Sequence, residues 1–299
     1  MMPSSVTALL LRAARELSAV TPTPALDAEL LLCAVCDLNR TDLATRRSVE
    51  LTAKQSENLS DLIERRAAGE PVAYLLGHKE FWSLDLAVNP STLIPRPETE
   101  QLVEQVLALI PPNTPCRIAE LGTGSGAVAL AIASERPLVH VTATDISQAA
   151  LQVASSNARR LGIQNVAFLC GDWFAPIHRS CFRLIVSNPP YVRNQDPLLQ
   201  SSTNHEPRAA LLAGNDGLQA LRAICCQAAA HLESAGALVL EHGHDQAPSL
   251  RALLSAAGFS SIVTCADGAG LPRVTFGQLE RTTDHVRICP EKTGTARRQ

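Results

Sequence analysis

The stretch Ile118-Ala119-Glu120-Leu121-Gly122-Thr123-Gly124-Ser125-Gly126 joins an apolar run to a glycine-rich loop, and an alanine-rich segment follows. This pattern predicts a buried strand over Cys116–Leu121 and a helix from Gly126. Glycines permit a tight turn and close approach of the backbone to a ligand, and the following helix N-terminus favours a negatively charged or polar group. Alone the loop is a weak signal, because a packing turn without a ligand explains it equally well. Read as Gly122-x-Gly124-x-x-Ala127, it also fits a dinucleotide-binding fingerprint.

Strands and helices alternate along the rest of the chain. The pattern predicts strands over 139–144, 166–169, 182–187, 237–241, 261–265 and 273–279, and helices over 147–161, 217–232 and 246–257. Such alternation is typical of an α/β protein with a doubly wound, mostly parallel sheet.

The N-terminal part of the chain has a helical pattern instead. Pro24 follows Thr23 as a first helical residue follows its N-cap, and Leu26, Leu30 and Cys33 recur at helical spacing. Thr52-Ala53-Lys54-Gln55 is a capping box for the next helix, and the alternation from Phe81 to Val88 predicts a hairpin strand. We therefore expect four regions: a small all-helical substrate-recognition domain (1–78), a hairpin and linker helix (79–112), the α/β domain (113–280) and a disordered polar tail (281–299).

Composition excludes several classes of protein. The formal net charge of −3 gives no global basic field for nucleic acid, and no apolar run is long enough for a membrane span. The N-terminus lacks a secretory signal pattern, so we expect a cytoplasmic protein. The nine cysteines are scattered through apolar stretches, and Cys33-x-x-Cys36 is interpreted as core packing. His242 and His244 have no convincing third ligand nearby, so no metal is expected.

Polar or aromatic residues follow successive strands. Asp145 comes roughly 20 residues after the glycine loop, where an acidic side chain binds ribose hydroxyls, although it could equally cap the helix that Ser147 opens. Trp173 follows the third strand and could lie against an adenine ring, or it could belong to an ordinary loop. Asn188 follows the fourth strand. Because the carboxyl ends of the strands meet at the ligand-binding crevice of a doubly wound sheet, we expect these residues and the glycine loop to form one site.

The tetrapeptide Asn188-Pro189-Pro190-Tyr191 directly follows the predicted strand 182–187. Proline has no backbone donor and a fixed φ, so the Pro189 carbonyl is free to accept a hydrogen bond from a ligand. Asn188 supplies a second acceptor and Tyr191 an aromatic face. The tetrapeptide therefore predicts a site for a planar group with N–H donors, either the exocyclic amine of a base or a carboxamide.

This set of motifs resembles the class I S-adenosylmethionine-dependent methyltransferases, and Asn-Pro-Pro-Tyr is similar to the motif of enzymes that methylate planar, conjugated nitrogens. Over nearly the whole chain the sequence is similar to the peptide chain release factor glutamine N5-methyltransferases. The segments that carry this similarity are 70–77, 81–82, 93–100, 122–126, 187–191, 206–211 and 241–243. The resemblance implies a Rossmann-like class I fold. It also implies methyl transfer from S-adenosyl-L-methionine, with S-adenosyl-L-homocysteine as product, to the side-chain amide nitrogen of the glutamine in the Gly-Gly-Gln motif of release factors.

The resemblance also implies roles for individual residues. The substrate amide would donate one hydrogen to the Asn188 side-chain oxygen and the other to the Pro189 carbonyl, while Tyr191 stacks on the amide plane. The helical N-terminal domain would help to seat the release factor. The residues implied to hold the cofactor are Gly122, Thr123, Gly124, Ser125, Gly126, Asp145, Trp173 and Asn188. Those implied to hold the glutamine are Asn188, Pro189, Pro190 and Tyr191, with Asn188, Pro189 and Tyr191 as the catalytic set.

Other functions explain parts of the sequence. A nucleic-acid amino-methyltransferase acting on adenine N6 or guanine N2 would share the cofactor loop and Asn188–Tyr191, but it needs a basic module with stacking aromatics. The acidic balance and the two Trp, two Tyr and six Phe residues do not favour one, so no sequence-specific nucleic-acid binding is expected. A dinucleotide-binding oxidoreductase would use the glycine loop and Asp145 but leave Asn188–Tyr191 without a task. A non-catalytic regulator that binds S-adenosylmethionine also fits these motifs.

Overall fold

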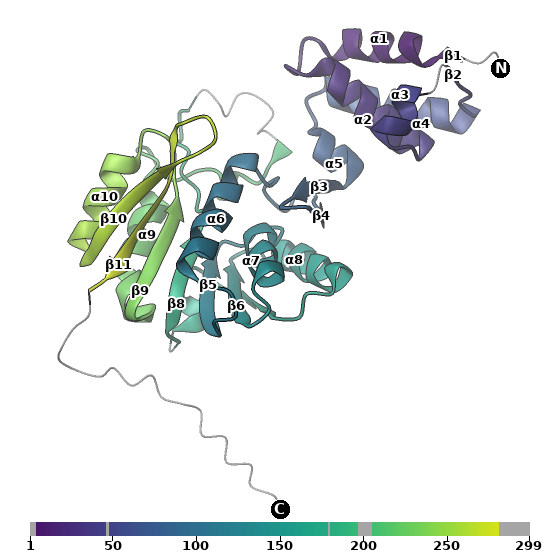
Figure 1. The fold of residues 1–299 in the computed structure, drawn as a ribbon. Helices are drawn as coiled ribbons and strands as arrows, with labels where there is room; N and C mark the ends of the chain where they lie inside the picture. The colour runs from purple at the N-terminus through teal and green to yellow at the C-terminus, as the bar shows by residue number, and fades with distance from the viewer. Residues whose placement is uncertain (1–3, 46–47, 179, 197–204, 281–299) are drawn as a thin grey trace, which may run out of the picture.

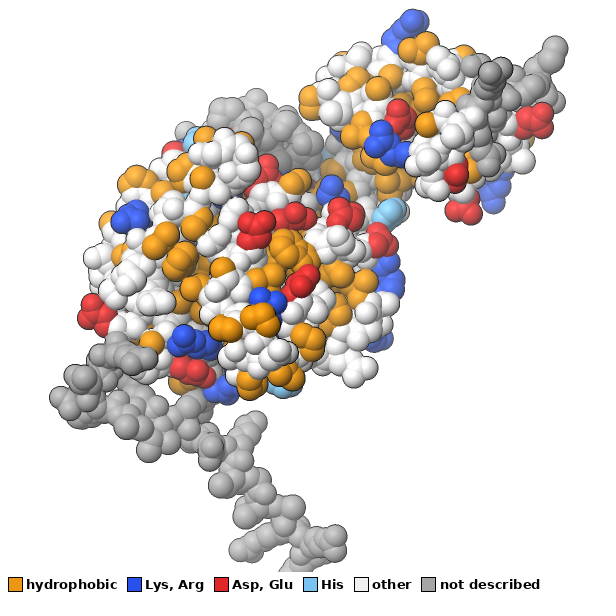
Figure 2. Space-filling model, in the orientation of Figure 1, with side chains coloured by type: hydrophobic (Ala, Val, Ile, Leu, Met, Phe, Trp, Pro, Cys, Tyr) orange, Lys and Arg blue, Asp and Glu red, His pale blue; other side chains and the backbone are white. Residues whose placement is uncertain are grey.

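The computed structural model describes residues 4–45, 48–178, 180–196 and 205–280, and the tail predicted over 281–299 lies outside them. The described chain forms a small helical lobe and a larger lobe built around a sheet, joined across a narrower neck (Figures 1 and 2). We expect no membrane span from the sequence, and no helix among the described residues has the length and apolar character to cross a bilayer.

Packed helices make up the small lobe. They are α1 (Val6–Leu17), α2 (Pro24–Cys36), α3 (Arg40–Thr45), α4 (Ala53–Ala67) and α5 (Val72–Leu76), beside a short pairing of β1 (Ser4–Ser5) with β2 (Ser48–Val49). The capping box at the start of α4 is confirmed, since Thr52 Oγ1 accepts from Gln55 N (3.2 Å) and Gln55 Oε1 accepts from Thr52 N (3.0 Å). Cys33 and Cys36 lie in the apolar core of this lobe, as the packing interpretation predicts.

The apolar residues that recur at helical spacing in α2 do not all face the core. Leu26 is exposed, whereas its neighbour Asp27 is buried. The reason is a long-range ion pair: Arg66 of α4 donates from Nε to Asp27 Oδ2 at 2.8 Å, with both side chains buried. Helix α2 therefore turns a polar residue inward, because its partner helix supplies the matching charge.

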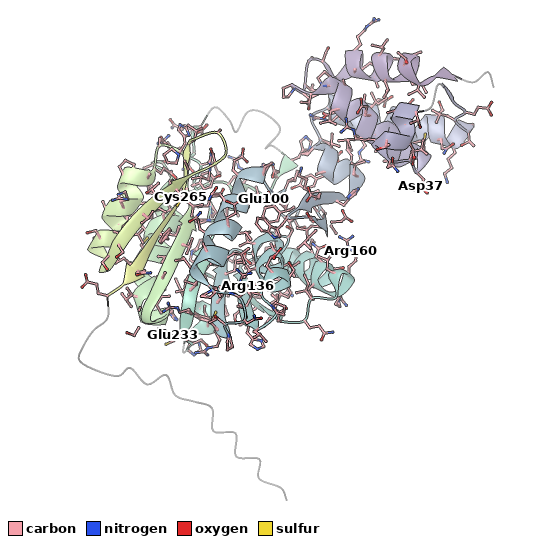
Figure 3. The ribbon with its side chains drawn as sticks, viewed as in Figure 1. Asp37, Glu100, Arg136, Arg160, Glu233 and Cys265 are labelled. Atoms are coloured by element: carbon pink, nitrogen blue, oxygen red, sulfur yellow. The ribbon has the colours of Figure 1, made fainter. Side chains whose placement is uncertain are left out.

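A hairpin connects the two lobes. The predicted hairpin is present, but the bounds of its strands differ. The run from Phe81 to Val88, predicted as one strand of it, contains the turn at Trp82 and Ser83, which joins β3 (His78–Phe81) to β4 (Leu84–Ala87). Both turn residues have positive φ (53° and 58°), as a tight two-residue hairpin requires. The turn folds the chain back, so that Phe81 and Leu86 enter the same core. Arg160 reaches the hairpin, where its Nη1 donates to Asp85 Oδ2 at 2.7 Å (Figure 3).

The large lobe contains a seven-stranded, doubly wound sheet, so the predicted fold class is confirmed. Its order is β10-β11-β9-β8-β5-β6-β7, in which only β11 runs antiparallel to its neighbours. The strands are β5 (Cys116–Leu121), β6 (Val139–Asp145), β7 (Val166–Cys170), β8 (Phe182–Ser187), β9 (Leu232–Glu241), β10 (Phe259–Ala266) and β11 (Pro272–Leu279). The predicted helix 217–232 is shorter, because β9 already begins at Leu232.

Helices cover both faces of the sheet (Figure 1). One core includes residues of α6 (Glu100–Leu109), α7 (Ala127–Glu135) and α8 (Gln148–Leu161), and the other includes residues of α9 (Gln219–Ala228) and α10 (Ala247–Ala256). A short 3-10 turn, η1 (Pro97–Thr99), leads from the linker into α6. The chain order reverses between β5 and β8, and a doubly wound sheet opens its ligand crevice at such a reversal.

Candidate active site

The glycine loop is held against the end of the neighbouring strand. Gly122 N and Thr123 N both donate to the Thr144 carbonyl, at 2.8 and 3.0 Å. Gly126 is the N-cap residue of α7 with φ 86°, a left-handed conformation that glycine adopts without strain. These contacts turn the chain sharply between β5 and α7 and place the loop at the crevice.

Asp145 connects this loop to the next helix. Its Oδ2 accepts from Gly124 N (2.9 Å) and its Oδ1 from Ser147 N (2.8 Å). The hypothesis that Asp145 itself caps α8 is wrong, because the N-cap is Ser147, whose Oγ accepts from Ala150 N. Asp145 is therefore a half-buried carboxylate that orders the loop and still borders the crevice.

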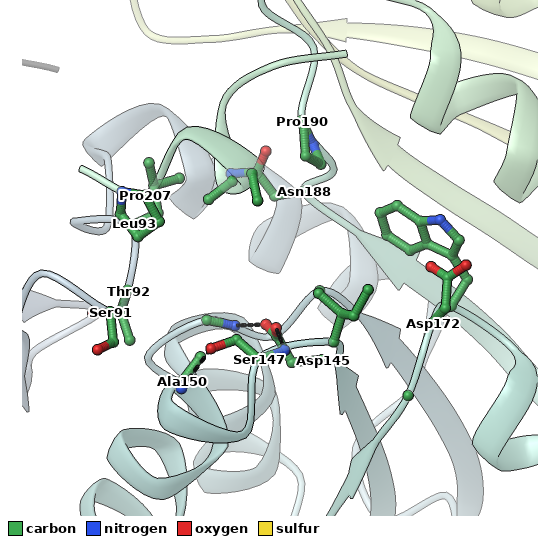
Figure 4. Close-up of a pocket in the computed structure, with 17 residues that line it drawn as sticks. Ser91, Thr92, Leu93, Asp145, Ser147, Ala150, Asp172, Asn188, Pro190 and Pro207 are labelled. Atoms are coloured by element: carbon green, nitrogen blue, oxygen red, sulfur yellow. Dashed lines mark hydrogen bonds between the residues drawn. The ribbon is translucent and has the colours of Figure 1, made fainter. Parts of the chain in front are cut away.

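A cavity of about 440 Å³ lies at this edge of the sheet (Figure 4). Six of the predicted site residues line it: Gly122, Gly124, Asp145, Trp173, Asn188 and Pro190. All three residues of the segment 171–173 line the wall, while the next residue, Phe174, is buried in the core. The cavity thus brings together residues that follow four different strands.

The other predicted site residues lie around the cavity rather than on its described wall. Thr123 is buried and donates from Oγ1 to Glu120 Oε2 at 2.5 Å, below the glycine loop. The Ser125 carbonyl accepts from Asn157 Nδ2 at 2.9 Å, and Gly126 is the N-cap residue of α7. Pro189 is buried, and Tyr191 points its hydroxyl at Glu241 Oε1 at 3.2 Å.

Part of the wall comes from residues for which no site role was predicted. They are Ser91, Thr92, Leu93, Ile146, Ser147, Ala150, Gly171, Asp172, Pro207, Ala209 and Ala210. Glu206 holds the linker and the later loop together, because its carboxylate accepts from Ile94 N (3.1 Å) and from Arg96 Nη2 (2.5 Å). The only sequence signal for this wall is that segments 93–100 and 206–211 carry part of the family resemblance.

The Asn188 amide has a defined partner. Its Nδ2 donates to Thr99 Oγ1 at 3.1 Å, across 89 positions of sequence. Because an amide oxygen only accepts hydrogen bonds, this contact leaves Asn188 Oδ1 as an acceptor beside the cavity. Ser187 supports this position, since its Oγ donates to the Leu121 carbonyl at 2.6 Å and ties the end of β8 to the end of β5.

Two buried carboxyl groups lie below the site. Burial raises the pKa of Glu120 to about 7, against the opposing hydrogen bonds from the Thr123 hydroxyl and the Ala129 backbone. Burial likewise raises the pKa of Glu241 to about 7, against the opposing effect of the Thr99 and Tyr191 hydroxyls. Burial and the nearby Glu241 also raise the pKa of Tyr191, so its hydroxyl keeps its proton near neutral pH.

The first of the two histidines after β9 has structural partners, and the second, His244, is exposed. His242 is buried, with Nδ1 2.8 Å from the Gly243 carbonyl and Nε2 2.8 Å from Thr275 Oγ1. Within the described parts of the chain, no group of three or more His, Cys, Asp or Glu side chains is placed to hold a metal ion.

The fold and the site define a methyltransferase. Residues 99–205 match the family model described as methyltransferase small domain, and residues 8–77 match the PrmC N-terminal domain. The release factor glutamine methyltransferase of Coxiella burnetii is 49% identical over 260 residues, covering 87% of this chain and 94% of that protein. That of Xylella fastidiosa (strain Temecula1) is 47% identical over 278 residues, covering 93% and 98%. The chain belongs to the release factor glutamine methyltransferase family.

A solved methyltransferase from Pyrococcus furiosus shares the fold, with a TM-score of 0.52 and 17% identity over 75% of this chain and 99% of that one.

Proposed function

We propose that the protein transfers a methyl group from S-adenosylmethionine to the side-chain amide nitrogen of the glutamine in the Gly-Gly-Gln motif of peptide chain release factors. The observation that carries this proposal is the orientation of Asn188. Its Nδ2 is bonded to Thr99, so its oxygen is left to accept a substrate N–H at the edge of the cavity. The similarity to release factor glutamine methyltransferases over most of the chain supports this choice of substrate.

The cavity wall suits the cofactor. Gly122 and Gly124 allow close approach of the backbone, and Asp145 can accept hydrogen bonds from ribose hydroxyls. Trp173 offers an aromatic surface for the adenine ring, and the exposed Asp172 offers an acceptor for its amino group. When bound, S-adenosylmethionine supplies a methyl group activated by its positively charged sulfur. No metal is part of this proposal.

The acceptor side solves a different problem, because the nitrogen lone pair of an amide is delocalised and weakly nucleophilic. Asn188 Oδ1 and the Pro189 carbonyl would each accept one hydrogen of the substrate NH₂ and so fix the direction of the nitrogen. Acceptors that are already in place also stabilise the positive charge that develops at this nitrogen during transfer. The Tyr191 ring would border the plane of the amide, while its hydroxyl is held by Glu241.

The remaining parts of the chain have proposed roles as well. The helical region 1–78 would seat the release factor, the hairpin and linker (79–112) would shape the entrance, and residues 113–280 would carry out methyl transfer. Since release factors act in translation, the protein would work in the cytoplasm. Direct sequence-specific binding to nucleic acid is not part of the proposal.

Radiolabelled methyl transfer to purified release factor tests the proposal. We expect label in the wild-type factor and none when the glutamine of its Gly-Gly-Gln motif is changed to alanine. DNA and ribosomal RNA, tested in parallel, should stay unlabelled. Label in nucleic acid but not in release factor would instead support an amino-methyltransferase acting on bases.

A further inference from the structure

Glu241, at the end of β9, is a buried carboxyl group without an assigned task. The residue is only 1% exposed, and its Oε1 accepts a hydrogen bond from the Tyr191 hydroxyl. Its Oε2 has no hydrogen-bond partner among the residues that the structure describes. Burying a carboxyl oxygen in this way costs free energy, so a reason for placing it here should be sought in its surroundings.

Thr99 lies between Glu241 and Asn188. It is buried (4% exposed), its Oγ1 accepts from Asn188 Nδ2, and its hydroxyl is near enough to the Glu241 carboxyl to lower the pKa of that group. A hydroxyl has one hydrogen to donate, and a carboxylate can only accept. An ionised Glu241 would therefore draw the Thr99 hydrogen toward its unpartnered oxygen, which leaves the Thr99 oxygen to accept from the NH₂ end of Asn188.

We propose that Glu241 and Thr99 are positioning residues that hold the Asn188 side chain with its oxygen, rather than its NH₂, toward the substrate amide. This inference rests on the proposed function. If the Asn188 amide were turned the other way, its NH₂ would face the N–H groups of the substrate. The substrate would then have only the Pro189 carbonyl as an acceptor. Tyr191 donates to the same carboxyl group and stays protonated near neutral pH, so it supports the same direction of donation.

The charge on Glu241 makes this direction sensitive to pH. A protonated Glu241 can donate to Thr99 and release the Thr99 hydrogen toward Asn188. Burial places the pKa of Glu241 near 7, with Arg273 of β11 lowering it and Glu98 of η1 raising it. Arg273 is also paired with Asp267 at 3.2 Å, and the adjacent His242 ring is bonded to Gly243 and Thr275. We therefore expect the rate of methyl transfer to fall as the pH drops below about 7.

The test is single-turnover methylation of release factor at saturating S-adenosylmethionine. Thr99→Val removes the acceptor for Asn188 and should lower the rate at least about tenfold, with cofactor affinity by calorimetry changing less than about threefold. Thr99→Ser keeps the hydroxyl and should recover most of that loss. Thr142→Val, at a half-buried position of β6, is the matched control and should change the rate less than about twofold.

A double-mutant cycle separates positioning from general damage. In the Asn188→Ala background, Thr99→Val should cost less than about a further twofold, because the group it orients is gone. Glu241→Gln, which cannot titrate, should lose the decline in rate below pH 7. Three results would each overturn the inference. They are rate losses that multiply in the double-mutant cycle, equal rate losses in Thr99→Ser and Thr99→Val, and a pH profile of Glu241→Gln that matches the wild type. Absence of release factor methylation by the wild type would instead refute the proposed function.

Discussion

The two halves of the site are held in place by different means. In the half formed by β5 and β6, both oxygens of Asp145 accept from backbone N–H groups, and Gly122 is bonded to the Thr144 carbonyl. In the half formed by β8 and β9, Asn188 and Glu241 depend on side chains that are distant in sequence, and one Glu241 oxygen has no partner among the described residues. Backbone contacts give the first half a fixed surface for binding, whereas side-chain contacts give the second half a direction for hydrogen bonding.

The largest effect is expected in the second half. Asn188→Ala removes the side-chain acceptor for the substrate amide, so turnover on release factor should fall about 10²- to 10⁴-fold. Cofactor affinity should fall much less, because the glycine loop and Asp145 remain. Single-turnover kinetics and calorimetry measure the two quantities separately. Near-normal methylation by this variant would contradict the mechanism.

The buried carboxyl group of Glu120, near the end of β5, should make the stability of the protein depend on pH. The pKa of Glu120 is about 7, against an ordinary value of 4.5, because burial favours its neutral form. Between these two values the folded state binds more protons than the unfolded state, so the contribution of Glu120 to stability is full below pH 4.5 and is lost as the pH rises through 7. The free energy of unfolding of the wild type, relative to Glu120→Gln, should therefore fall by roughly 3 kcal/mol between pH 4.5 and 8.

Urea denaturation at several pH values measures this difference. The exposed Glu104, on α6, provides the matched control, and Glu104→Gln should show a change of less than about 0.5 kcal/mol over the same range. A flat difference between wild type and Glu120→Gln would show that Glu120 does not carry a raised pKa in the folded protein.

The same contrast explains what could be predicted from the sequence. Gly122, Asp145 and Asn188 directly follow or end strands, and strand ends of a parallel sheet converge, so local pattern was enough to bring them together. Leu93 and Ala210 reach the cavity because Glu206 bonds to Ile94 and Arg96 across more than a hundred positions. No periodicity reports such a contact.

Local pattern also failed where a distant partner or a turn decides the outcome. Asp27 is buried because Arg66 lies opposite it, and nothing in α2 itself indicates this. The turn at Trp82 and Ser83 lacks the asparagine and glycine that usually mark a two-residue hairpin, so the alternation was interpreted as one strand. Such errors concern the lobes around the site rather than the strand order of the sheet.

A smaller effect is expected from the carboxylate of the first half. Asp145→Ala should weaken S-adenosylmethionine binding about 10- to 30-fold, because the ribose loses its acceptor and Gly124 N loses a bond. The rate at saturating cofactor should change much less than in Asn188→Ala. Asp145→Asn, which keeps one side-chain oxygen, should fall between the two affinities. Calorimetry that shows unchanged affinity in Asp145→Ala would refute its role in binding the ribose.

The smallest expected effect is a difference in stability between alanine variants of two glycines, one of which is the N-cap residue of α7. Gly126 and Gly162 both have positive φ (86° and 70°), so replacing either by alanine should cost about 1–2 kcal/mol in backbone strain. A Cβ at Gly126 would also lie 3.1 Å from Ala154 Cβ and Leu130 Cδ1, whereas one at Gly162 would have nothing within 4 Å. Gly126→Ala should therefore destabilise the protein by about 1 kcal/mol more than Gly162→Ala in urea denaturation. Equal losses would mean that α7 and α8 can separate slightly at no cost, and that the first half of the site is less rigid than its backbone bonds imply.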